Sequence, residues 1–313
     1  MQFTRLDPHR GAAPIDGMRL TRFFLIAVGS IAPCVLGAQS PAPALPVAAD
    51  SSLRQLITLR DGSTILGRIT QSWGDSARLE SSAGTMILRR ASVASVKTIP
   101  ASSIHDGVYW PEDPNATRLF FAPTARMLKK GEGYVANHWL FFMDGYGGIT
   151  DRFTLGGTMT LFPTDNFLKN NAYFISPKIG VTQGESFNTA VGAWIGGAPF
   201  SSDAGAVNTF GIAYGVATWG GPDASLTLGG GYGFAEGKMA RNPMAMIGGT
   251  RRLSRHVAFV TENWIAPNEQ QHPLVSAGIR ILGEKVTWDL GAVTVLGTSS
   301  TVFVPWIGAA WKF

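Results

Sequence analysis

Cysteine is almost missing from this sequence of 313 residues, and the one cysteine, Cys34, lies near the N-terminus. A disulfide bond needs two cysteines and a thiolate metal site needs several, so the chain alone forms neither. The histidines lack ligand spacing, and the Asp-Gly-Tyr-Gly sequence at 144–147 lacks the further carboxylates of a calcium loop. The glycine-rich stretch at 229–233 lies inside a predicted strand, with no helix after it to bind a dinucleotide. We therefore expect no metal and no cofactor.

Charged residues are also scarce. They make up 15% of the chain, and 26 basic against 21 acidic residues give a formal net charge of +5. The closest approach to a basic cluster is Arg251, Arg252 and Arg255, which we interpret as a solvated turn. Nucleic-acid-binding proteins concentrate Lys and Arg on one face or element. We therefore expect no nucleic-acid partner.

Long apolar runs are missing except at 23–38. A transmembrane helix needs about 20 consecutive apolar residues, and a helical membrane protein would carry several such runs. Arg19 and Arg22 precede the single run, and small residues end it at Ala38, which is the pattern of an export signal. We predict a signal peptide over 1–38, with Met18 as an alternative start.

The next part of the chain predicts a small β domain. A linker rich in Pro, Ala and Ser covers 39–53, and short alternating strands follow over 54–100. Asp61-Gly62 between two such strands is a strong hairpin signal. About five strands in fewer than fifty residues resemble a small SH3-like or Sm-like barrel, a resemblance that implies no activity. A second linker, 101–115, leads to the remainder.

From 116 to 313 the sequence predicts twelve strands, most of them with about the 9–11 residues that a tilted strand needs to cross a bilayer. In one of them Leu226, Leu228 and Tyr232 share a face, while Thr227 and Gly229 share the other. A soluble barrel would bury the apolar face, whereas a membrane barrel turns it toward lipid. Alternation alone does not separate the two cases. The predicted strands are 117–125, 134–143, 153–162, 173–181, 187–196, 209–219, 226–235, 244–252, 257–265, 274–282, 286–295 and 301–311.

The predicted connections favour the membrane barrel. Every second connection is short, and most of those between are longer, including 163–170 and 197–208. Short turns at one end and long loops at the other are typical of outer-membrane barrels. An even strand count places both chain ends on the short-turn side, so we expect the small β domain in the periplasm. The short connections are 150–152, 184–186, 221–223, 254–255 and 283–285.

The C-terminus carries a further signal, because Trp311 and the final residue Phe313 share one face of the last strand. This resembles the terminal signature by which the barrel assembly machinery recognises its clients. We expect that machinery and outer-membrane lipid as partners, and the sequence predicts no oligomeric state. The fold class is all-β, a twelve-stranded antiparallel transmembrane β-barrel preceded by a small SH3-like domain.

Several short segments resemble an uncharacterised family of bacterial outer-membrane β-barrel proteins, across about two-thirds of the chain. The resemblance implies a barrel fold and an outer-membrane location, and it implies no activity or mechanism. The segments that carry it are 115–118, 129–134, 211–215, 262–264 and 283–285.

Charged residues on the inward phase of the predicted strands are the candidate site. They form either a salt-bridged network that fills a narrow barrel or the lining of a polar pore. We favour the network, because twelve strands enclose less space than the 16–18 of aqueous porins. The many inward Gly and Ala residues leave room for a slender channel. The candidates are Arg118, Lys178, Glu262, Arg280, Asp289 and Lys312.

An enzyme is the competing class, because twelve strands also build the outer-membrane phospholipase, whose nucleophile is a serine beside a histidine. Only His138 lies in mid-strand, and no serine stands near it at a motif spacing. We interpret it as a lumen or interface histidine. The sequence thus predicts a structural, anchoring or narrow-pore passive role without catalysis, and a phospholipase-like or deacylase-like enzyme is the alternative.

Overall fold

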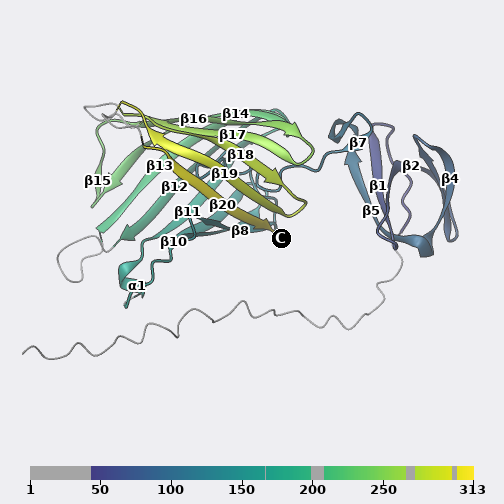
Figure 1. The fold of residues 1–313 in the computed structure, drawn as a ribbon, viewed down its shortest axis with the longest axis horizontal. Helices are drawn as coiled ribbons and strands as arrows, with labels where there is room; N and C mark the ends of the chain where they lie inside the picture. Colours follow the sequence, from purple (N-terminus) through teal and green to yellow (C-terminus); the bar gives the residue numbers. More distant parts are fainter. Residues whose placement is uncertain (1–43, 166, 199–207, 266–271, 298–301) are drawn as a thin grey trace, which may run out of the picture.

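The structure is a computed structural model that describes residues 44–165, 167–198, 208–265, 272–297 and 302–313. The signal peptide predicted over 1–38 lies outside the described residues. A small sheet and a large barrel follow one another along the long axis of the molecule (Figure 1). No helix among the described residues is long and apolar enough to cross a membrane.

The small sheet has the strand order β4-β3-β2-β1-β5. Its apolar side chains alternate along the strands and meet in one core, where Ile57, Ile69 and Leu79 are fully buried. The Asp61-Gly62 turn joins the first two strands, which pair antiparallel as expected. Gly62 takes a φ of 86° in this turn, a conformation that glycine adopts without strain. The strands are β1 (Leu53–Leu59), β2 (Thr64–Trp73), β3 (Ser76–Ser81), β4 (Gly84–Arg89) and β5 (Val93–Pro100).

The connection between the two bodies is more ordered than the predicted linker. A small hairpin of β6 (Ile104–His105) and β7 (Val108–Tyr109) occupies part of 101–115. Two contacts tie this hairpin region to the barrel. His105 lies 3.0 Å from Asp223, and Arg252 Nη2 donates to the carbonyl of Pro111 at 2.8 Å.

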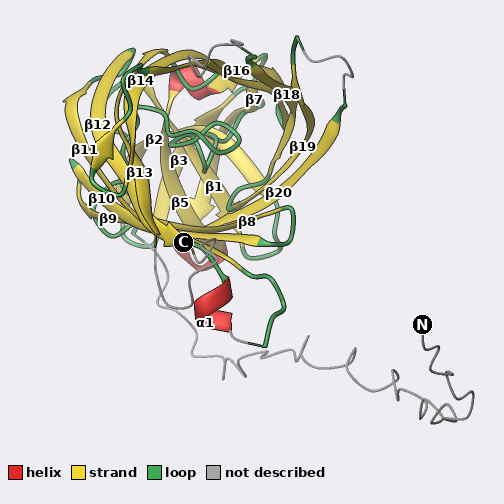
Figure 2. Cartoon of the chain, turned by 90° about the vertical axis from the view of Figure 1, so that its left-hand side faces the viewer, coloured by secondary structure: helices red, strands yellow, loops and turns green. Residues whose placement is uncertain are grey.

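The barrel is a closed ring of twelve antiparallel strands, which Figure 2 views from one end. Neighbours in sequence pair around the ring, and the first wall strand pairs with the last, from Tyr134 against Lys312 to His138 against Gly308. The short β15 (Lys238–Met239) adds to the edge of β14. The wall strands are β8 (Gly133–His138), β9 (Phe142–Thr150), β10 (Phe153–Thr160), β11 (Tyr173–Gln183), β12 (Phe187–Ala198), β13 (Asn208–Gly220), β14 (Ala224–Ala235), β16 (Met244–Ser254), β17 (Val257–Ile265), β18 (Leu274–Leu282), β19 (Val286–Val295) and β20 (Val304–Lys312).

The predicted number of strands is confirmed, but two of the predicted strands are wrong. Residues 117–125 form no wall strand and hold only an isolated bridge between Arg118 and Pro123. The predicted strand 134–143 is instead two strands, β8 and β9. Between them Trp139 and Leu140 turn the chain with φ values of 49° and 65°. The two errors cancel, so the count of twelve remains.

The two ends of the barrel differ as the sequence predicts. At the short-turn end, which also holds the C-terminus and faces the small sheet, the strands are joined by turns of two or three residues (Figure 1). At the opposite, long-loop end, every connection except 139–141 is longer. One of them contains the single turn of helix α1 (Phe167–Asn170).

Candidate functional site

The barrel wall is apolar outside and polar inside. Ile175, Ile179 and Trp288 point outward and are each more than half exposed. On neighbouring inward positions Lys178 and Asp289 are buried. Side chains alternate between the two faces of a strand, so the sequence pattern sets this polarity directly. The lumen is therefore the place where the chain gathers its charged groups.

The lumen is filled by residues 113–128, which we call the plug segment. Leu119, Phe120 and Ala122 of this segment are almost fully buried, and they pack against apolar side chains of the wall. Pro114 and Pro123 lack the N–H that a ladder requires, which disfavours a wall strand here. The polar backbone groups of such an irregular segment need partners in the barrel interior.

Four charged side chains provide the main attachment of the plug segment. Arg280 and Asp289 face each other on β18 and β19, with Nε and Oδ1 2.6 Å apart. The plug segment adds Arg118, whose Nη1 lies 2.9 Å from Asp289 Oδ2, and Asp113, whose Oδ2 lies 2.9 Å from Arg280 Nη1. Two positive and two negative groups balance, which a buried cluster requires because an unpaired charge there is costly.

The arginines of this cluster also bind the plug backbone. Arg280 donates to the carbonyls of Asn115 and Leu119, and Arg118 donates to the carbonyl of Phe120 at 2.7 Å. The Asn115 amide in turn donates to the Thr287 hydroxyl of β19 at 2.8 Å. Charged donors thus satisfy carbonyls that no strand pairs, and such bonds are stronger than neutral ones.

Glu262 on β17 makes a second attachment. One carboxylate oxygen accepts the backbone N–H groups of Phe121 and Ala122 at 2.8 and 2.9 Å. The other accepts the indole N–H of Trp264 at 2.8 Å. The carboxylate therefore binds the middle of the plug segment as an acceptor of three hydrogen bonds.

Lys178 on β11 makes the third attachment, again through backbone. Its ammonium donates to the carbonyls of Thr124 and Arg126 at 3.2 and 2.8 Å. Nearby, the hydroxyl of Thr218 accepts the N–H of Ala125 at 2.9 Å. The plug segment is thus bound to the wall at the β18–β19 pair, at β17, at β11 and at β13.

The structure brings five of the six predicted charged residues to the plug, but it corrects two expectations. Arg118 comes from the plug segment and not from a wall strand. Lys312 lies outside the buried cluster, at the short-turn end, where its ammonium pairs with Glu132 at 3.1 Å and remains partly exposed. Sequence reasoning missed Asp113, because it lies in what we predicted to be a linker and no strand phase marks it.

The C-terminal residues close the ring. Phe313 and Gly133 exchange backbone hydrogen bonds of 2.9 and 3.1 Å, which extends the seam between β20 and β8. Trp311 and Phe313 are about half exposed, and their rings lie 5.5 Å apart on the outside of the barrel. An added Cβ at Gly133 would collide with the Phe313 ring, so glycine permits this close approach.

His138 lies in the lumen near the long-loop end. Its Nε2 lies 2.9 Å from Asp144 Oδ2, and both side chains are buried. Its ring packs 5.4 Å from that of Trp306. Among the described residues, no serine forms a hydrogen bond with this histidine.

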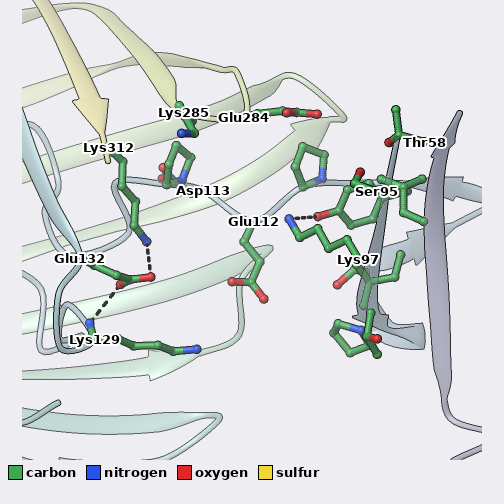
Figure 3. Close-up of a pocket in the computed structure, with 18 of the residues that line it drawn as sticks. Thr58, Ser95, Lys97, Glu112, Asp113, Lys129, Glu132, Glu284, Lys285 and Lys312 are labelled. Carbon is green, nitrogen blue, oxygen red and sulfur yellow. Dashed lines mark hydrogen bonds and ion pairs between the residues drawn. The ribbon is translucent and has the colours of Figure 1, made fainter. Parts of the chain in front are cut away.

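A cleft of about 710 Å³ separates the small sheet from the short-turn end of the barrel (Figure 3). Its lining carries both signs of charge, with Lys97 from the small sheet, Glu112 from the connection and both lysine and glutamate side chains from the barrel. Lys97 of β5 donates to the Tyr109 hydroxyl at 3.2 Å, and Glu132 pairs with Lys312 across the barrel rim. This mixture favours no single sign of ligand charge.

No protein-family model matches this chain. No curated protein matches it either. Solved structures that resemble it are barrels. The KdgM porin in complex with oligogalacturonate gives a TM-score of 0.43 at 9% identity, covering 58% of this chain and 98% of that chain. The NanC porin gives 0.41 at 11%, covering 58% and 99%. OmpT, an outer membrane protein of Vibrio cholerae, gives 0.33 at 12%, covering 86% and 100%. At TM-scores below 0.5 these similarities carry no argument about function.

Proposed function

We propose that this protein is an outer-membrane β-barrel that the plug segment keeps closed and that anchors the small sheet at the periplasmic face. The apolar exterior supports the membrane location, because side chains such as Ile179 and Trp288 would otherwise stand exposed to water. The strands β11 to β14 have 11 to 13 residues, enough to cross the hydrocarbon core at a tilt.

The single observation that carries the closed state is the attachment of the plug segment by buried charges. Asp289 and Arg280 bind it from one side of the lumen and Glu262 binds it from another. A twelve-stranded ring has little room beside such a filling. Passive passage of small solutes therefore requires the plug segment to withdraw, and we place any transport in that second state.

The lengths of the connections support the proposed orientation. Short turns face the periplasm in outer-membrane barrels, and the small sheet lies at the short-turn end. We propose an SH3-like fold for this sheet, supported by its strand order and its separate core. We further propose lipid and the barrel assembly machinery as partners, supported by the outward Trp311 and Phe313 at the end of the chain.

The lipid-acting enzyme has less support. Its histidine would be His138, which is buried inside the lumen and paired with Asp144, whereas a lipid substrate would approach from the exterior. A serine nucleophile needs a base within hydrogen-bond reach, and in the described part of the chain no serine meets that condition at His138.

Conductance in planar lipid bilayers tests the closed state. We expect the full chain to be silent, and we expect the double variant R118A/E262A to show discrete openings because two attachments of the plug segment are lost. The matched control is R68A/E80A, which removes an exposed pair on the small sheet and should stay silent. Steady openings in the unaltered chain would contradict the proposal. So would silence in a double variant that still shows the heat-modifiable mobility of a folded barrel.

A further inference from the structure

A cavity of about 290 Å³ lies inside the barrel at the long-loop end. Its floor is the plug segment, through Phe120 and Phe121, and its walls are strand ends on the far side from the small sheet. Three tryptophans line it, namely Trp139, Trp264 and Trp306. The cavity is therefore a chamber above the plug segment. It shares Glu262 with the attachments of that segment and lies apart from the cluster of Asp113, Arg118, Arg280 and Asp289.

Aromatic rings dominate the lining. Trp306 lies 4.6 Å from Trp139 and 5.4 Å from Phe120, measured between ring centroids, and Phe142 lies 6.0 Å from Trp139. The rings meet at tilted or edge-on angles, the arrangements that aromatic side chains prefer. A flat aromatic molecule between them would gain contacts of the same kind.

The carboxylate and the hydroxyl of the lining are already paired, whereas Nδ1 of His138 and Nε1 of Trp306 have no hydrogen-bond partner among the described residues. The Glu262 carboxylate accepts three hydrogen bonds, and the Ser276 hydroxyl donates to the Glu262 carbonyl. The imidazole of His138 pairs with Asp144. A charged ligand would lose its hydration and find only these two ring nitrogens without a partner, which is costly. The chamber selects against charge.

The volume limits the ligand. An apolar cavity of about 150 Å³ stays dry and binds benzene. A chamber of about 290 Å³ has room for one or two rings. Pockets for larger ligands start at about 300 Å³ and extend well beyond it.

We propose that this chamber is a binding site for uncharged aromatic molecules of one or two rings. This binding site is additional to the closed barrel proposed above. Ligand binding requires only the floor and the walls of the chamber and no movement of the plug segment. Phe120 and Trp306 supply the ring contacts, and the remaining rings define the shape.

The test uses crystals of the full chain soaked in bromobenzene, with the anomalous signal of bromine as the readout. We expect a bromine peak among Trp139, Trp264 and Trp306. The variant V293F places a ring into the chamber from β19 and should remove the peak. The variant V286F makes the same change on the outward face of the same strand and should keep it.

Two further measurements test the charge of the ligand and its affinity. We expect 4-bromobenzoate, which is charged, to give no peak, and we expect bromobenzene to bind V293F at least about tenfold more weakly in titration calorimetry. A chamber without bromine in the unaltered chain would overturn the proposal. A peak of equal height in V293F or with 4-bromobenzoate would overturn it as well, provided that the variant shows the heat-modifiable mobility of a folded barrel.

Discussion

The small sheet and the barrel are made of the same alternating strands, yet they bury opposite faces. In the small sheet Ile57 and Leu79 are inside, and the charged pair of Arg68 and Glu80 is at the surface. In the barrel Ile179 is outside and Arg280 is fully buried. The comparison teaches that alternation defines the two faces of a strand, while the surrounding solvent decides which face is inside.

The inversion has a consequence for the barrel interior. A water-soluble sheet buries its apolar face against itself, and its charges stay hydrated. A membrane barrel turns its apolar face toward lipid, so its lumen must be filled by water or by polar side chains. Here the plug segment fills the lumen. The buried charged groups bind that segment as well as one another.

The largest expected effect on stability concerns the buried charged cluster of the barrel. Asp289→Ala leaves the guanidinium of Arg118 without a carboxylate, and removal of one partner of a buried pair costs about 3–5 kcal/mol. We expect that loss in the free energy of unfolding, measured by urea titration in lipid vesicles. Arg68→Ala in the exposed pair of the small sheet should cost at most about 1 kcal/mol. Equal losses in the two variants would contradict the account.

The next largest expected effect on stability concerns the core of the small sheet. Ile57→Ala empties space in a closed core and should cost about 2–5 kcal/mol, seen as faster hydrogen exchange of β1 and β2. Ile179→Ala makes the same change on the barrel exterior. Lipid fills the space there, so the loss should be smaller. A larger loss for Ile179→Ala would place that side chain in a packed protein interior instead of in lipid.

A third pair of variants compares the two exposed faces. Ile179→Lys puts a charge into the hydrocarbon region and should cost about 2–4 kcal/mol in vesicles. Ile87→Lys on the small sheet puts the same charge into water and should change stability by less than about 0.5 kcal/mol. Urea titration of both variants checks the difference, and equal values would refute the assignment of lipid to the barrel exterior.

Much of the fold could be predicted from the sequence, because alternation and turn residues act locally. The pattern located ten of the wall strands near their observed bounds, and Asp61-Gly62 marked the first hairpin. The pattern failed at 117–125, where apolar residues recur as in a strand but pack inside the lumen of the barrel. It also failed at Trp139-Leu140, because no glycine signals that turn.

The site was harder to predict than the fold. Strand phase placed Lys178, Glu262, Arg280 and Asp289 on the inward face, and that is a local property. Which of them meet depends on how the ring closes and on where the plug segment enters. Asp113 joins the network from outside any strand, so no periodic signal could mark it.

The central claim is that the barrel turns its apolar face toward lipid, and nitroxide scanning of β10 in vesicles tests it most directly. With Cys34 replaced, single cysteines at Leu155 and Met159 should give labels that collide with oxygen dissolved in the bilayer, while Thr154 and Thr158 should be shielded. The account predicts this period of two. Oxygen accessibility at Thr154 and Thr158 that equals or exceeds the value at Leu155 and Met159 would contradict it.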